Sequence, residues 1–88
     1  MGMLTKSPGV GVDDDETTTY VAAIPWGPIV VLEGVAAIIW ALAQGSARAE
    51  VPRLVAEVTG ADLDEIREQV DTFLSELLQR GLLIEASV

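Results

Sequence analysis

Residues 25–43 read PWGPIVVLEGVAAIIWALA, and Glu33 is the only charged side chain in this stretch. Its continuous apolar part begins after Pro28 and is shorter than the roughly 20 residues that a membrane-spanning helix needs. The pair formed by Glu33 and the glycine after it divides the stretch in two. The first part is rich in β-branched residues and the second in alanine, so the pattern predicts a strand over residues 29–32 followed by a helix, and no membrane span.

The helix that starts at Gly34 is expected to form the centre of the core. Its apolar residues recur at steps of three and four, and Gly45 is placed as the residue after its end. Because the helix is apolar almost all round, other elements must wrap it, and Trp40 is expected to pack inside. Glu33, just before the helix, is expected to cap its amino end.

Two further strands are predicted on the amino-terminal side. Residues 9–12 alternate small and apolar side chains, and residues 17–24 are rich in threonine, tyrosine and valine. The acidic run at residues 13–16 predicts a turn between them, and the short connection over residues 25–28 suits only an antiparallel hairpin. Residues 1–8 are expected to be a disordered tail.

Two more helices are predicted on the carboxyl-terminal side. Pro52 suits the first turn of a helix that ends at Gly60. Asp62, with Glu65 three residues later, forms a capping signature for a long third helix that ends at Gly81. The apolar segment LLI after that glycine is expected to dock the carboxyl-terminal tail on the core.

This order of elements predicts an α+β fold in which a three-stranded antiparallel sheet is followed by three helices. No repeat, low-complexity segment or linker interrupts the chain, so residues 9–88 are expected to form a single domain. A chain of 88 residues can bury one core, and half of its residues are hydrophobic.

The composition excludes several function classes. The chain has no cysteine and no histidine and carries a formal charge of −9, which disfavours nucleic acids and anionic membranes as partners. Catalysis would have to use carboxylates and hydroxyls, and the acidic run at residues 13–16 lacks the ligand spacing of a calcium loop. We therefore expect no enzymatic activity, no catalytic residue, no metal site and no cofactor, and we expect a cytoplasmic location.

The strand over residues 29–32 lacks the features that usually protect the edge of a sheet. It carries no charge, glycine or proline, whereas the strand at the other edge contains two glycines and runs into four acids. Its apolar side chains point to both faces. Two interpretations fit: the strand is buried as simple core, or its open edge receives a strand from another chain.

The third helix is expected to form the other side of such a binding site, opposite the strand. Followed at about 100° per residue, its apolar arc extends from Phe73 to Leu74 and Leu78 and ends at Arg67 and Asp71. This arc is wider than one core stripe requires. The surplus either lines a groove beside the strand or serves the burial that a small domain needs.

Two motifs in the carboxyl-terminal part of the chain point to a family. The first helix ends with IWALAQG over residues 39–45, and the third helix ends with FLSELLQRGLL over residues 73–83. With three strands before them, these motifs resemble the PqqD-like family, and the resemblance covers residues 10–84. The family often has an aromatic residue and a Leu-Asn pair in the last strand, where this chain has PIVVLE over residues 28–33.

The resemblance implies a winged-helix-like recognition element for ribosomally made, modified peptides. Such domains bind the leader segment of a precursor peptide as an extra strand on the third strand, against the third helix. They then deliver it to a modifying enzyme, which is a protease and cyclase in lasso-peptide systems or a radical SAM maturase in others. The predicted peptide-binding residues are Ile29, Val30, Val31, Leu32, Arg67, Asp71, Leu74 and Leu78.

Two alternatives from other classes remain open. A winged-helix fold also supports DNA binding, although a third helix rich in acids is a poor reader of phosphates. An obligate homodimer could instead pair the open strands of two copies. Because the chain is acidic, the leader or the enzyme is expected to present basic residues.

Overall fold

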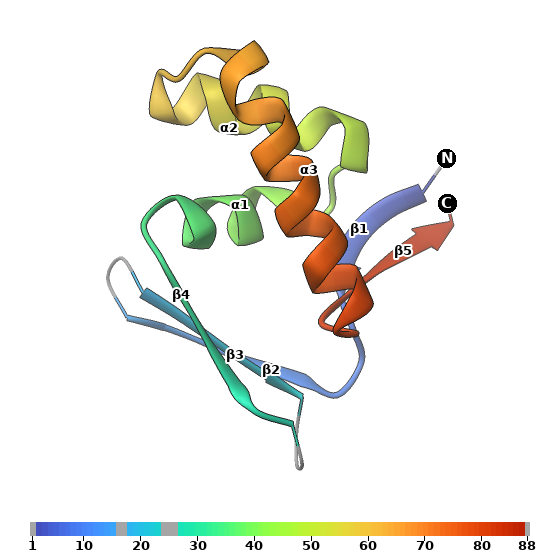
Figure 1. Cartoon of the computed structure of the whole chain (residues 1–88). Coiled ribbons are helices and arrows are strands. Elements are labelled where there is room, and N and C mark those ends of the chain that lie inside the picture. The colour runs from blue at the N-terminus through green and yellow to red at the C-terminus, as the bar shows by residue number, and fades with distance from the viewer. Residues whose placement is uncertain (1, 16–17, 24–26, 88) are drawn as a thin grey trace.

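The computed structural model describes residues 2–15, 18–23 and 27–87. It is an α+β structure, as the sequence predicted, with a three-stranded antiparallel sheet, three α-helices and a second, two-stranded sheet (Figure 1). The strands are β1 (Gly2–Lys6), β2 (Val10–Asp15), β3 (Thr18–Ala23), β4 (Ile29–Glu33) and β5 (Leu83–Ser87). The helices are α1 (Val35–Ala43), the 3₁₀ turn η1 (Arg48–Glu50), α2 (Val51–Thr59) and α3 (Leu63–Gln79). Within the described ranges, no helix has the length and apolar character to cross a membrane.

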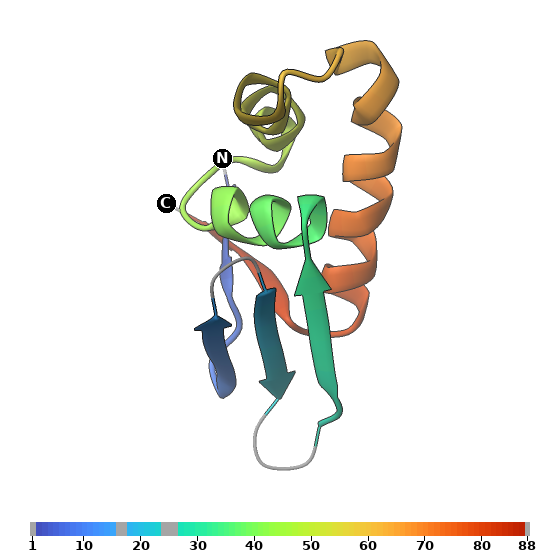
Figure 2. The same cartoon turned by 90° about the vertical axis from the view of Figure 1, so that its left-hand side faces the viewer.

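The main sheet has the order β2-β3-β4, with β3 in the centre, and Figure 2 shows β4 at the edge nearest to α3. Tyr20 lies opposite Val31, and Val21 lies opposite Val30. Val21 is fully buried and Val30 half-buried, whereas Tyr20 and Val31 are exposed. Because side chains alternate along a strand, the sheet has an inner face that packs on the core and an outer face that meets solvent.

The central helix α1 supplies the core that the sequence predicted. Trp40 is only 4% exposed, and Ile39 and Ala43 are buried beside it. The expectation that Glu33 caps α1 is wrong, because Glu33 is the exposed last residue of β4. Gly34 occupies the N-cap position with φ 59° and makes no side-chain cap. Glycine adopts such a positive φ without the steric cost that other residues have.

The two later helices have the predicted ends. Asp62 caps α3 through its Oδ1 atom, which accepts a hydrogen bond of 2.9 Å from the backbone N–H of Asp64. Gly60 ends α2 in the left-handed conformation, with φ 74°. Pro52 stands in the first turn of α2, where its missing N–H costs no helical hydrogen bond.

The prediction of a disordered tail over residues 1–8 is wrong. Gly2–Lys6 forms β1, which pairs antiparallel with β5 at the other end of the chain. Leu4 is fully buried, its N–H donates to the carbonyl of Ser46, and its carbonyl accepts from Gly45. The partners of this strand lie far away in the sequence, so no local pattern revealed it.

The acidic run also differs from its prediction as a turn. Asp13, Asp14 and Asp15 belong to β2 and pair with β3, while position 16 lies outside the described residues, as do positions 24–26 of the predicted hairpin connection. The Oδ1 atom of Asp14 accepts a hydrogen bond of 2.9 Å from the hydroxyl of Thr19, which is buried. Pairing with a threonine-rich strand therefore extends β2 into residues of low strand propensity.

Candidate functional site

The outer edge of β4 is open. In the described part of the chain, β4 pairs with β3 alone. Ile29 is 68% exposed and Val31 is 49% exposed, and the strand carries no charge before Glu33. An edge strand presents a row of unpaired N–H and C=O groups, and this one lacks the usual protection against pairing with another chain.

The four predicted strand residues contribute in two ways. Val30 is half-buried and Leu32 is 2% exposed, so their side chains hold the edge against the core. Ile29 and Val31 point to the outer face. A partner strand would therefore bind to the backbone of β4. Alternate residues of β4 direct their N–H and C=O groups away from β3 and toward such a partner. Pro28 precedes them and has no N–H, so pairing would begin after it.

The predicted residues on α3 are placed differently. Leu74 is fully buried in the core, so its prediction as a surface anchor is wrong. Arg67 and Asp71 line a hollow of about 420 Å³ with residues of η1 and α2. Asp71 also lines a hollow with Glu85 of β5. In Figure 1, β5 and β4 lie on opposite sides of α3, so the structure does not bring Asp71 together with β4.

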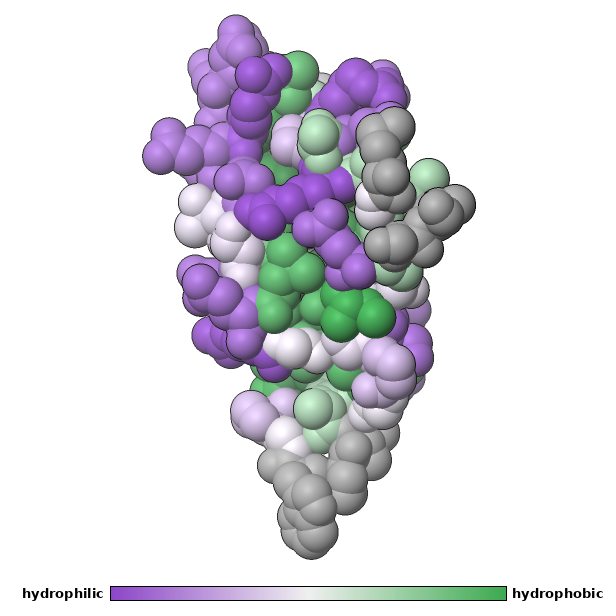
Figure 3. Space-filling model, turned by 90° about the vertical axis from the view of Figure 1, so that its right-hand side faces the viewer, coloured by the Kyte–Doolittle hydropathy of each residue, from purple (hydrophilic) through white to green (hydrophobic). Residues whose placement is uncertain are grey.

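The half-buried Leu78 lies seven residues after Asp71 and therefore on the same side of α3. Figure 3 looks at the molecule from the side of β1 and β5. Its upper half is mostly hydrophilic, whereas apolar residues gather in the middle and continue in the lower part.

An arginine that the sequence did not single out explains the position of Asp71. Arg48 of η1 donates from Nε to Oδ1 of Asp71 at 3.0 Å and from a terminal nitrogen to the Asp71 carbonyl at 3.3 Å. The same terminal nitrogen donates to the hydroxyl of Ser75. These contacts join η1 to α3, and their partners are 23 and 27 residues apart in the sequence. A local sequence motif cannot predict contacts at such a separation.

Removing this arginine is expected to lower the stability of the fold. For Arg48→Ala, we expect a loss of about 1 kcal/mol in the free energy of unfolding, because the pair is partly exposed and solvent weakens it. Arg67→Ala is the matched control, since Arg67 makes no ion pair in the described ranges, and its effect should stay within about 0.5 kcal/mol. Urea unfolding followed by circular dichroism measures both, and equal losses would contradict the assignment.

The side of α3 that is nearer to β4 carries other apolar residues. Followed around the helix at about 100° per residue, Ile66 and Phe73 lie on the edge of the apolar arc opposite Arg67 and Asp71. Both are half-buried and pack against the core cluster, as Val30 does. Their positions in the arc were visible in the sequence, but which edge faces β4 was not.

The described residues show no arrangement for metal chemistry. No group of three or more acidic side chains in residues 2–15, 18–23 and 27–87 is placed to hold a metal ion. The chain has neither histidine nor cysteine. The features that stand out are the open backbone edge of β4 and the apolar surfaces beside it, which suit binding of an extended peptide.

Comparison of the sequence with known proteins identifies a protein family that the chain matches. The family model described as "Coenzyme PQQ synthesis protein D (PqqD)" matches residues 13–83. The matched range runs from β2 to the start of β5 and includes β4 and all three α-helices. No curated protein and no solved structure matches the chain.

Proposed function

The chain belongs to the PqqD family, and we propose that it binds the leader segment of a ribosomally synthesised precursor peptide by strand addition to β4. PqqD-family proteins are non-catalytic accessory proteins that work with a precursor peptide and a modifying enzyme. The observation that carries the proposal is the open, uncharged edge of β4. The bound leader is presented to the enzyme, which is a protease and cyclase or a radical SAM maturase, in the cytoplasm where the precursor is made.

In this complex the leader becomes a fourth strand of the main sheet. Its backbone exchanges hydrogen bonds with the outward-directed residues of Ile29–Leu32, and its side chains alternate between the two faces. Side chains on one face meet the half-buried Phe73 and Ile66 on α3. Side chains on the other face lie beside Ile29 and Val31. This arrangement replaces the wall of Leu74, Leu78, Arg67 and Asp71 that the sequence suggested.

The energetics require an apolar anchor in addition to the backbone. Two outward-directed residues of β4 can make about four hydrogen bonds, each worth about 0.5–1.5 kcal/mol net. Micromolar affinity needs about 8 kcal/mol after the cost of association has been met. Burying one leucine or phenylalanine side chain adds about 1.5–3 kcal/mol. We therefore propose that one or two leader side chains insert beside Phe73 and Ile66.

Titration of the full chain with synthetic leader peptides tests the function. The peptides are taken from the short precursor encoded beside the gene for this chain, with a scrambled leader of equal composition as the control. We expect calorimetry to give one leader per chain, and hydrogen exchange to show protection of alternate amides in Ile29–Glu33. Equal binding of the scrambled peptide, or protection confined to residues outside β4, would contradict strand addition at this edge.

A further inference from the structure

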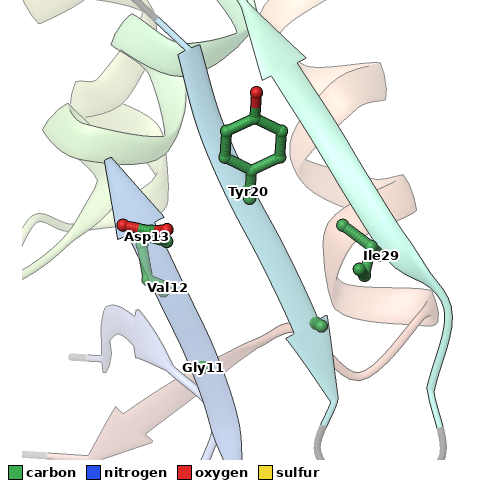
Figure 4. Close-up of a pocket in the computed structure, with 6 residues that line it drawn as sticks. Gly11, Val12, Asp13, Tyr20 and Ile29 are labelled. Atoms are coloured by element: carbon green, nitrogen blue, oxygen red, sulfur yellow. The ribbon is translucent and has the colours of Figure 1, made fainter. Parts of the chain in front are cut away.

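The outer face of the main sheet contains a second surface, distinct from the β4 edge. The residues that face it are Gly11, Asp13, Asp15, Thr18, Tyr20, Ala22, Ile29, Val31 and Glu33. In the strand register, Gly11, Ala22 and Ile29 form one row, in which the first two positions have little or no side chain. These small residues leave a hollow of about 490 Å³ between larger neighbours. Figure 4 shows Asp13, Tyr20 and Ile29 projecting from three adjacent strands around it.

The hollow is apolar, Asp13 lies at its border, and two further carboxylates lie farther along the same face. Tyr20 is 38% exposed and Ile29 is 68% exposed, an unusual pair of large apolar side chains for a free sheet face. The next rows of the same face place Asp13 beside Tyr20, and Asp15 and Glu33 at either side of Thr18. These three carboxylates are exposed, and no ion pair satisfies them within the described residues.

We infer that this outer face docks a protein surface that presents a large apolar side chain next to lysine or arginine. The apolar side chain fills the hollow over Gly11 and Ala22, and the basic groups meet Asp13 at its border and the carboxylates farther along the face. Under the proposed function, on which this inference rests, the partner is the modifying enzyme. The leader pairs with the backbone at the edge of β4 and the enzyme covers the outer face of the sheet, so both partners bind at once.

The charges argue against a second copy of the chain as the occupant. Stacking two outer faces would bring Asp13, Asp15 and Glu33 of one copy near the same acids of the other. Each copy also carries a formal charge of −9, which favours the monomer through mutual repulsion. A basic partner gains from the same charges.

The docking face continues across the edge of β4. Ile29 and Val31 belong to the outer face and also to the strand that receives the leader. A leader strand beside them adds its own outward side chains to the same surface. An enzyme seated there contacts both the domain and the bound leader, so leader and enzyme each raise the affinity for the other.

Two titrations test this inference with the full chain. The first measures affinity for the purified modifying enzyme encoded beside the gene, with and without leader peptide; the second measures affinity for the leader alone. Ala22→Lys places a long cationic side chain in the hollow, and Asp13→Asn removes one bordering charge. We expect Ala22→Lys to weaken enzyme binding at least about tenfold and Asp13→Asn about threefold, with leader affinity changed less than about twofold.

Val58→Lys on α2 is the matched control, because Val58 is 60% exposed and lies outside the outer face; it should leave both affinities unchanged. Unchanged enzyme affinity in Ala22→Lys, or no enzyme binding by the wild-type chain, overturns the inference. Loss of leader affinity in Ala22→Lys means that the leader occupies the hollow, and a wild-type dimer dissociated by Ala22→Lys means that a second copy does; both overturn it. Failure of the wild-type chain to bind the leader instead removes the proposed function.

Discussion

A single proline in β4 is expected to weaken leader binding strongly while the domain stays folded. Val30 and Val31 are adjacent, so the N–H of one points to β3 and the N–H of the other points to the open edge. Proline at the position that donates to β3 removes a ladder hydrogen bond and leaves its acceptor unpaired, which should cost at least about 1–3 kcal/mol in stability. Proline at the outward-directed position is tolerated at a sheet edge but removes a donor that the leader needs.

For the tolerated variant, we expect a leader affinity at least about 30-fold lower, which corresponds to about 2 kcal/mol for one lost hydrogen bond and the obstructing ring. Urea unfolding measures the stability of Val30→Pro and of Val31→Pro, and calorimetry measures their affinity for the leader. Val31→Thr is the control, because it keeps the N–H and a β-branched side chain, and it should change affinity less than about threefold. If the stable proline variant binds the leader like the wild type, the leader does not pair with β4.

Truncating a residue near the amino end is expected to cause the largest loss of stability. Leu4 is fully buried between the core and the loop after α1, and it pairs with Glu85 across the two-stranded sheet. Leu4→Ala leaves a cavity, and such cavities cost about 2–5 kcal/mol. Domains of this size have a total stability of about 5–15 kcal/mol, so the variant loses a large fraction of it.

Met3→Ala is the matched control on the same strand, because Met3 points to the other side and is 44% exposed. Its effect is expected to stay below about 1 kcal/mol. Urea unfolding at 25 °C, followed by circular dichroism, compares the two variants with the wild type. A Leu4→Ala variant as stable as the Met3→Ala variant would show that β1 adds nothing to the core.

Elements fixed by local chemistry could be predicted from the sequence. Asp62 and Gly60 mark helix ends through side-chain and backbone preferences that act within one turn. The β-branched run of β4 and the alanine-rich start of α1 likewise differ in propensity on either side of Gly34. The same pattern showed that β4 lacks edge protection, so the strand half of the candidate site follows from the local sequence.

The helix half of the site could not be predicted in the same way. The apolar arc of α3 has two edges, one with Arg67 and Asp71 and the other with Phe73. The spacing of the residues along α3 does not tell which of these two edges faces β4. Contacts with residues that are distant in the sequence decide it. Arg48 turns the Asp71 edge toward η1, away from β4, and the burial of Leu74 follows from the same orientation.

The sequence by itself determined the order of the three main-sheet strands and the three helices, and where α2 and α3 end. It also determined the apolar centre at Trp40 and the uncharged character of β4, because these features depend on neighbours within a few residues. Only the tertiary structure decided that the amino-terminal residues form β1 with β5, that Glu33 does not cap α1 and which side of α3 lies nearer to β4. It also decided that Gly11 and Ala22 meet in one row beneath a hollow. Each of these depends on residues that are distant in sequence and are brought together by shared burial, whose free energy belongs to the folded chain as a whole.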